Sequence, residues 1–290
     1  MRMNFPLPTL TLVVSLIGLI AVPAAGTDLC GDANADGAVD IPDAVCIIGY
    51  IFCGQPAPQP LYAADANHDG TVNLADAVQL IIYVFYGGPP PDCPPVTDVD
   101  GNIYQTVTIG NQVWMAENLK VTHYRNGDPI PHVADFSTWA SLSTGAYCAY
   151  NNDPVLVADH GRLYNWYAAS DSRNIAPAGW HVATDAEWQT LIDYLGGLVV
   201  AGGKMKEVGL AHWSSPNAGA TNSSGFTALP GGYRRNDGNF VAKSDYAYFW
   251  SSTEYSNGYA LFRALSYLDS QIHRYYFPNL DGFSVRCIRD

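Results

Sequence analysis

A stretch near the amino terminus of this 290-residue chain has no positive charge. Residues 28–95 contain nine aspartates but no glutamate, lysine or arginine, and they supply most of the formal net charge of −13. A surface of that sign repels a phosphate backbone, so nucleic acid is excluded as a partner. An all-aspartate segment also repels itself, and a bound cation would relieve that repulsion.

The chain also lacks long apolar runs, apart from one near its start. Residues 7–22 are mostly apolar, follow Arg2 and lead into small residues at 24–26. This arrangement predicts a secretory signal peptide over residues 1–26. A membrane anchor is disfavoured because the run is short and has no basic flank, and no other stretch is long enough to span. We therefore expect a secreted protein, extracellular or at the cell surface, whose six cysteines favour disulfides.

Catalytic motifs are missing as well. The sequence has no His-Glu-x-x-His motif, no nucleophile elbow and no phosphate-binding glycine loop. His181 and Glu187 flank one predicted helix, but a surface histidine and a helix-capping glutamate explain them better than acid–base chemistry. We expect no catalytic residues and no enzymatic activity.

Two segments, 33 residues apart, carry the same oxygen-rich pattern. Residues 32–43 and 65–76 each place side-chain oxygens at loop positions 1, 3, 5, 9 and 12, with glycine at position 6. A calcium ion takes about six to eight oxygen ligands, and glycine permits the sharp turn that wraps the chain around it. The repeat therefore predicts two bound calcium ions.

Each loop runs into an apolar segment with helical spacing. Residues 41–52 and 74–85 place apolar side chains three or four positions apart, and proline-rich stretches follow at 56–60 and 89–95. The second of these predicts a stiff linker. Two short helices that are apolar on more than one face cannot bury everything against each other, so an apolar docking surface should remain. We assign to this surface Ile41, Ile48, Ile51, Leu74, Ile81, Ile82 and Val84.

Residues 30–93 resemble a type I dockerin, a small all-α, EF-hand-like module that folds around calcium and binds cohesin domains. The resemblance implies that Ala38 and Thr71 supply backbone carbonyls to the two ions. It implies the following side-chain ligands: Asp32, Asn34, Asp36, Asp40 and Asp43 in the first loop, and Asp65, Asn67, Asp69, Asn73 and Asp76 in the second. It also implies that the ends of the module lie close together, which would let Cys30 pair with Cys93.

The usual dockerin recognition residues are absent. Loop positions 10 and 11 hold Ile41-Pro42 and Leu74-Ala75 in place of hydroxyl residues. The partner is therefore left open between a cohesin-like protein, the carboxy-terminal domain and another copy of this chain. Within the first predicted helix, Cys46 and Cys53 are separated by roughly 10 Å of helical rise, which is beyond disulfide reach while both stay helical.

From residue 96 onward the sequence changes to short aromatic strands separated by turns. Residues 104–109 and 112–115 predict a hairpin with a tight turn. Thr184 with Glu187 forms a capping box and predicts a helix, and a second short helix is expected over 161–169.

Four phrases in this region, at residues 161–169, 177–181, 249–254 and 282–290, resemble the Fibrobacter succinogenes major paralogous domain. That family is similar in fold to C-type lectins and formylglycine-generating enzymes, which implies an α+β domain over residues 98–290. The resemblance also implies a bridge between Cys148 and Cys287. Several tyrosines could stack on sugars or on protein. They are Tyr233, Tyr255, Tyr259, Tyr267, Tyr275 and Tyr276.

The sequence thus predicts a multidomain chain: a signal peptide (1–26), a dockerin-like module (27–93), a linker (94–97) and a C-type-lectin-like domain (98–290). We expect a secreted bacterial protein that binds two calcium ions, docks to a partner and presents a recognition surface. By resemblance its setting is extracellular polysaccharide degradation or cell-surface organisation, with polysaccharide as a further partner. The alternatives are a structural subunit of a calcium-stabilised homo-oligomer or filament, and an enzyme that uses the carboxy-terminal domain.

Overall fold

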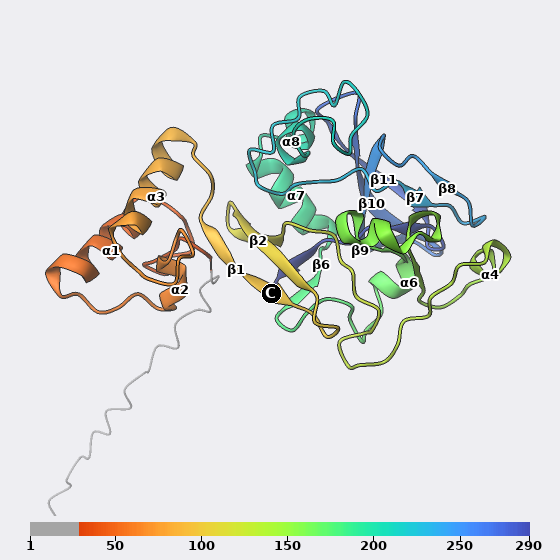
Figure 1. Ribbon diagram of the computed structural model, residues 1–290, viewed down its shortest axis with the longest axis horizontal. Helices are drawn as coiled ribbons and strands as arrows, with labels where there is room; N and C mark the ends of the chain where they lie inside the picture. Colours follow the sequence, from red (N-terminus) through yellow and green to blue (C-terminus); the bar gives the residue numbers. More distant parts are fainter. Residues whose placement is uncertain (1–28) are drawn as a thin grey trace, which may run out of the picture.

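The computed structural model describes residues 29–290, so the predicted signal peptide lies outside the described residues. A small helical module, coloured red to orange in Figure 1, lies beside a larger domain of strands and helices. In the described part of the chain, no helix combines the length and apolarity needed to cross a membrane.

The small module contains two long helices and one short one. Helices α1 (Ile41–Cys53) and α3 (Leu74–Tyr86) follow the two oxygen-rich loops, and α2 (Leu61–Ala64) lies between them in the chain. Both long helices end at a glycine in the left-handed conformation, Gly54 and Gly87, where a side chain would be strained. The small module has a hydrophobic core of its own, made of Ala33, Ala44, Ile47, Ala64, Ala66, Ala77 and Leu80.

The larger domain contains three antiparallel sheets with the strand orders β1-β2-β3-β13-β6, β11-β10-β9 and β4-β5-β12-β7-β8. The strands are β1 (Asp92–Thr97), β2 (Ile103–Ile109), β3 (Gln112–Met115), β4 (Tyr147–Cys148), β5 (Leu163–Asn165), β6 (Trp180–Val182), β7 (Tyr233–Arg234), β8 (Phe240–Val241), β9 (Tyr246–Ser256), β10 (Tyr259–Ser266), β11 (Ile272–Pro278), β12 (Gly282–Phe283) and β13 (Cys287–Arg289). The helices are α4 (Phe136–Ala140), α5 (Val157–His160), α6 (Trp166–Ala169), α7 (Asp185–Tyr194) and α8 (Leu198–Met205), with 3₁₀ turns at Tyr150–Asn152 and Pro154–Leu156.

Local sequence patterns predicted several of these elements. The predicted hairpin forms as β2 and β3, and α7 begins at the capping box of Thr184 and Glu187. The helix expected over 161–169 is wrong in its first half, where the chain forms strand β5. Asn165 ends that strand and its side chain accepts a hydrogen bond from the Ala168 backbone, so the helix begins only at Trp166.

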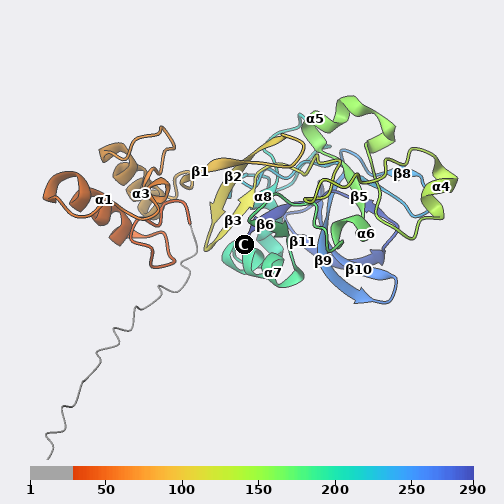
Figure 2. The ribbon, with the colours of Figure 1, turned by 90° about the horizontal axis from the view of Figure 1, so that it is seen from below.

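The expected linker at 94–97 is also corrected by the structure. These residues belong to β1, which pairs with β2 and brings Cys93 opposite Thr106 and Val96 opposite Tyr104. Both views show β1 leading from the small module straight into the larger domain (Figures 1 and 2). The prolines are tolerated because β1 is the edge strand of its sheet and its register shifts between Cys93 and Val96.

The two parts of the chain contact each other directly. Leu29 belongs to the hydrophobic core of the larger domain, and Val39 and Tyr62 of the small module pack against that core. On the other side of the junction, the hydroxyls of Tyr83 on α3 and Tyr194 on α7 lie 3.0 Å apart. The module is therefore held at several points rather than swinging on a free tether.

Candidate calcium loops and docking surface

The first loop is organised by two aspartates that bind backbone amides. Asp32 accepts hydrogen bonds from Asp36 N (3.0 Å) and Gly37 N (2.8 Å). Asp43 accepts from Asn34 N (3.1 Å) and from Asp40 N (2.8 Å), so it closes the loop and holds the start of α1. Positions 1 and 12 of the loop thus fix its path.

The second loop repeats this arrangement. Asp65 accepts from Asp69 N (3.1 Å) and Gly70 N (2.9 Å), and Asp76 accepts from Asn67 N (3.2 Å) and Asn73 N (2.7 Å). The glycine at position 6 has a positive φ in both loops, 88° at Gly37 and 87° at Gly70, as the sharp turn requires. The two loops therefore share one backbone conformation.

Four carboxylates of the loops are buried, and none of them has a cationic partner among residues 29–290. The exposed fractions are 2 % for Asp32, 0 % for Asp43, 6 % for Asp65 and 0 % for Asp76. Burial raises the pKa of Asp43 to about 6 and raises that of Asp32 as well. A buried carboxylate is costly unless it meets a positive charge, and residues 28–95 contain no lysine or arginine.

The chemistry of this donor set fits a hard cation. Asp40 Oδ1, at position 9, is buried and has no hydrogen-bond partner in the described part of the chain. No group of three or more His, Cys, Asp or Glu side chains there is gathered as a metal site. The loops do not depend on such a group, because asparagine side chains and backbone carbonyls supply part of an EF-hand-like ligand set. The predicted ligands lie in two oxygen-only loops suited to calcium.

The predicted docking surface is only partly exposed. Leu74, Ile82 and Val84 are exposed, and Ile41 is half-buried. Ile48, Ile51 and Ile81 are half-buried as well, and they pack against the module's own core. The buried residues of the two long helices are Ala44 and Ile47 in α1 and Ala77 and Leu80 in α3, and they face the other helix. The three isoleucines lie at the border of these buried faces.

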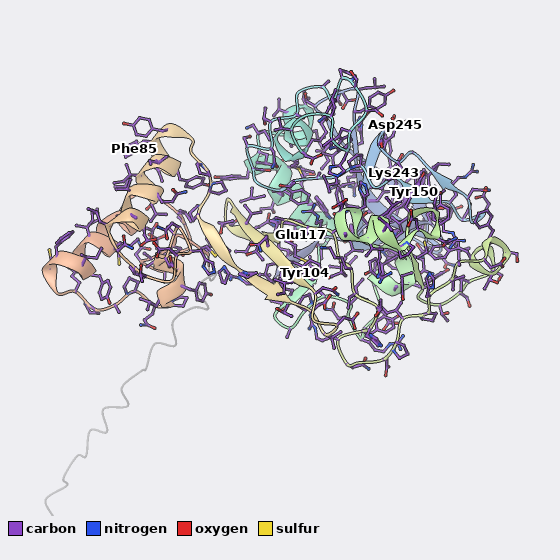
Figure 3. The ribbon with its side chains drawn as sticks, viewed as in Figure 1. Phe85, Tyr104, Glu117, Tyr150, Lys243 and Asp245 are labelled. Carbon is purple, nitrogen blue, oxygen red and sulfur yellow. A yellow bond between two sulfur atoms is a disulfide. The ribbon has the colours of Figure 1, made fainter. Side chains whose placement is uncertain are left out.

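The prediction left out four exposed apolar side chains of the long helices. They are Val45, Phe52, Val78 and Phe85, with exposed fractions of 60, 67, 45 and 66 %. Phe85 projects from α3 in Figure 3. The signal for them was present in the sequence, because Val45 and Phe52 lie seven residues apart and recur 33 residues later as Val78 and Phe85. We call these four residues the docking face.

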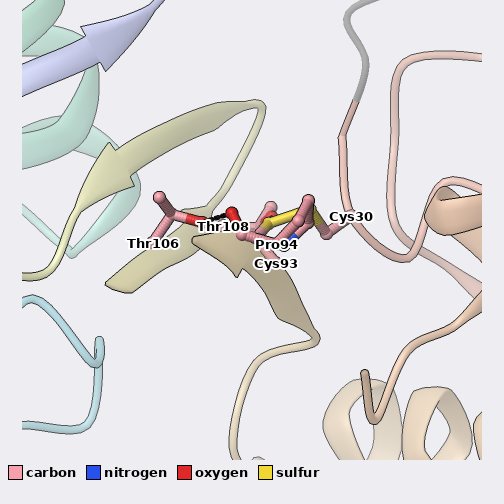
Figure 4. The surroundings of a disulfide bond; sticks show 5 residues. All are labelled: Cys30, Cys93, Pro94, Thr106 and Thr108. Atoms are coloured by element: carbon pink, nitrogen blue, oxygen red, sulfur yellow. Dashed lines mark hydrogen bonds between the residues drawn. A yellow bond between two sulfur atoms is a disulfide. The ribbon is translucent and has the colours of Figure 1, made fainter. Parts of the chain in front are cut away.

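The structure confirms one predicted disulfide, Cys30–Cys93, and contradicts the other. Cys30 and Cys93 form a disulfide with Cα atoms 5.4 Å apart, beside Thr106 and Thr108 of β2 (Figure 4). The Cys148–Cys287 prediction is wrong: both thiols are buried and free, because β4 and β13 belong to different sheets. Burial raises the pKa of Cys148 to about 12. Cys46, near the middle of α1, and Cys53, at its end, stay unpaired.

His181 and Glu187 form a structural link. His181 Nε2 lies 2.8 Å from Glu187 Oε1, and its Nδ1 lies 2.6 Å from Asp290 Oδ1. The second Glu187 oxygen accepts from Thr184 N at the start of α7. The hydrogen bond to Glu187, with a second to Asp290, raises the pKa of His181. Since both ring nitrogens are occupied, this pair ties the last residue of the chain to α7.

Of the predicted tyrosines, Tyr255, Tyr259, Tyr275 and Tyr276 are exposed, whereas Tyr233 and Tyr267 are half-buried. Tyr275 and Tyr276 line a cavity of about 670 Å³ on the three-stranded sheet. Tyr246 and Tyr248 line it too, but no pattern along the sequence predicts this, because only strand register places them there.

Comparison with known families accounts for both parts of the chain. The family model "Dockerin type I domain" matches residues 30–85, and "Fibrobacter succinogenes major domain" matches residues 107–289. No curated protein and no solved structure matches the chain. Type I dockerin domains bind calcium and cohesins, and dockerin-containing proteins are typically extracellular or at the cell surface. The chain belongs to the Fibrobacter succinogenes major domain family and carries a type I dockerin domain ahead of that domain.

Proposed function

We propose that this chain is a secreted, non-catalytic adaptor that holds an extracellular recognition domain on a cohesin-bearing partner. The dockerin module binds two calcium ions, one in each loop. The larger domain has a C-type-lectin-like fold and recognises polysaccharide. The carrying observation is the pair of matching loops with four buried, uncompensated carboxylates, each leading into a helix that exposes apolar side chains.

In each loop the first and last aspartates would hold the ion between them. Asp32 and Asp43 already fix the loop backbone, and the Ala38 carbonyl lies in the intervening turn. Calcium supplies the positive charge that the module lacks. Because Asp43 also binds the first turn of α1 through Asp40 N, ion binding stabilises the helix that carries Val45 and Phe52. Asp76 does the same for α3 through Asn73 N.

Docking would use the apolar docking face. Val45 and Phe52 on α1 and Val78 and Phe85 on α3 are related by the 33-residue repeat. Contiguous exposed apolar residues mark protein interaction sites. Their apolar character replaces the hydroxyl residues that are missing at loop positions 10 and 11.

The test is capture of a purified type I cohesin by the full chain in calcium and in chelator. We expect capture in calcium, loss of capture in chelator, and at least about tenfold weaker capture by the Phe52→Ala/Phe85→Ala double variant. Phe136→Ala is the matched control, since Phe136 is an exposed phenylalanine on the other domain. If the double variant captures cohesin as well as the wild type does, the docking face is not the binding surface.

A calcium-stabilised homo-oligomer is the second candidate, and the same exposed side chains favour it. Size-exclusion chromatography separates the two. A monomer in calcium that captures cohesin supports the adaptor, whereas calcium-dependent self-association that Phe52→Ala/Phe85→Ala abolishes supports the oligomer. Turnover of any substrate by the full chain would overturn the non-catalytic assignment.

A further inference from the structure

A trough runs along one face of the sheet formed by β9, β10 and β11. The opposite face is buried, with Phe249 and Leu265 packed in the core that contains Trp188 of α7. On the trough face the central strand carries small side chains, Ala264 and Ser266. Strand register places larger residues on both sides of them: Tyr248 and His273 opposite Ala264, and Tyr246 opposite Ser266.

The result is a cavity with a small-residue floor and aromatic walls. Its volume is about 670 Å³, within the roughly 300–1,000 Å³ typical of small-ligand sites. Phe262 and Tyr275 are cross-strand partners at one end, while Leu268 and Asp269 lie in the turn at the other. Such a trough offers flat apolar surfaces on two sides to a ligand between them.

Polar groups accompany these rings. In the part of the chain that the structure describes, the hydroxyls of Tyr246, Tyr248 and Tyr275 make no hydrogen bond to protein. At the rim, His273 Nε2 lies 3.5 Å from Asp269 Oδ2. The trough therefore combines aromatic faces with several hydroxyl donors and acceptors that are free to bind a ligand.

The charges around the trough favour a neutral ligand over an anionic one. The ammonium group of Lys206 donates to three backbone carbonyls, of Ala218, Ser266 and Asp269, at 2.7–2.9 Å. Arg274 points to the other side of β11, where it pairs with Asp185 at 2.9 Å. Among the described residues that line the trough, the acidic group is Asp269 and no lysine or arginine is present.

We propose that this trough binds a neutral oligosaccharide segment of a polysaccharide chain. A sugar presents apolar C–H faces and hydroxyl edges, which match the aromatic walls and the free tyrosine hydroxyls. The proposal rests on the recognition role proposed above for the larger domain and assigns that role to named residues. Tyr275 stacks on one ring of the ligand, and Tyr248 contributes both a ring and a hydroxyl.

The test is affinity electrophoresis of the full chain through native gels that contain hydroxyethyl cellulose, arabinoxylan or glucomannan, with alginate as the anionic comparison. We expect at least one neutral polysaccharide to retard the protein. Tyr275→Ala should weaken retardation by about tenfold, and Tyr248→Phe should weaken it by less because the ring remains. Tyr275 is 57 % exposed, so its removal leaves the core intact. Tyr86→Ala, an exposed tyrosine on the dockerin module, is the control.

Two results would overturn the proposal that the trough binds sugar. One is no retardation by any neutral polysaccharide, and the other is equal retardation of wild type, Tyr275→Ala and the trough-filling Ala264→Leu. Retardation by alginate alone would overturn the neutral assignment. Cohesin capture by the wild-type protein keeps the two proposals apart. Wild-type capture without retardation by any neutral polysaccharide refutes the trough and leaves the docking role, whereas retardation without capture refutes the docking role alone.

Discussion

The dockerin module and the larger domain bury charge in opposite ways. The module buries four aspartates and contains no lysine or arginine, whereas the larger domain buries Arg234, Arg263 and Arg286 with exposed fractions of 0–1 %. Arg286 donates to Asn118 Oδ1 and to the carbonyls of Met115, Phe226 and Thr227 at 2.7–2.9 Å. Burial lowers the pKa of Arg286 to about 9, but its partners are built into the fold.

The cores differ in the same direction. Five of the seven buried core residues of the module are alanine, while the larger domain buries Trp114, Trp188 and Trp250. Small side chains remove little apolar surface from water, so the module gains little from its core. The larger domain thus supplies its own hydrogen-bond acceptors for its buried charges and its own large core, whereas the module has neither. We therefore expect the module to depend on an external cation and on its attachment to the neighbouring domain.

Calcium removal should have the largest effect, and it tests the difference in stability between the module and the larger domain. At free calcium one hundred times the dissociation constant, two sites would stabilise the module by about 5 kcal/mol in total. Chelator should therefore unfold the module and leave the larger domain folded. Calorimetry and far-ultraviolet circular dichroism with calcium titration measure this.

The Asp43→Ala/Asp76→Ala double variant should reproduce the effect of chelator in the presence of calcium. Asp159→Ala is the matched control, because Asp159 is an exposed aspartate of the larger domain. A module transition that is the same in calcium and in chelator would refute the idea that a cation completes its fold.

Loss of the Cys30–Cys93 disulfide should have the next largest effect. The bridge closes a chain segment of 63 residues, which corresponds to about 4 kcal/mol of chain entropy in the unfolded state. Cys30→Ser/Cys93→Ser should lower the denaturant midpoint of the module in calcium. Cys46→Ser serves as control, since that thiol is free. An unchanged midpoint would show that the contacts of Leu29, Val39 and Tyr62 suffice for attachment.

The smallest expected effect is on the pH dependence of the larger domain's stability. Burial raises the pKa of Asp281 to about 7, although the hydrogen bond from Asn236 N opposes the shift. The folded chain therefore holds a proton on Asp281 between pH 3.8 and about 7 that the unfolded chain has released. Its stabilising contribution is complete below the lower value and is lost as the pH rises through the upper one.

Asp281→Asn keeps the shape and the acceptor oxygen but carries no charge. It should raise the stability of the larger domain by on the order of 2 kcal/mol at pH 8, with little change at pH 4. Thermal unfolding at both pH values measures this. Equal effects at the two pH values would mean that the charge of Asp281 does not destabilise the fold. The proposed contrast with the loop aspartates, whose charge calcium would neutralise, would then be weaker.

The limits of sequence reasoning follow from how far apart the interacting residues lie. The docking face was partly missed because Ile48 and Ile81 fit the helical pattern as well as Val45 and Val78 do, and only the packing of α1 on α3 separates them. The Cys148–Cys287 pairing failed because strand order places β4 and β13 in different sheets. The proline-rich stretch, read as a linker, became β1 once an edge position in a sheet was open to it.

The sequence by itself determined the order of the two domains and the conformation of both oxygen-rich loops. The loop hydrogen bonds reach across nine residues at most, so the local chemistry of Asp, Asn and Gly is enough to shape them. Only the tertiary structure decided which surfaces the loops and strands present. The Tyr83–Tyr194 contact spans 111 residues. The trough of Tyr248, Ala264 and His273 arises from strand register, which brings residues from three strands together through hydrogen bonding and burial rather than through any pattern along the chain.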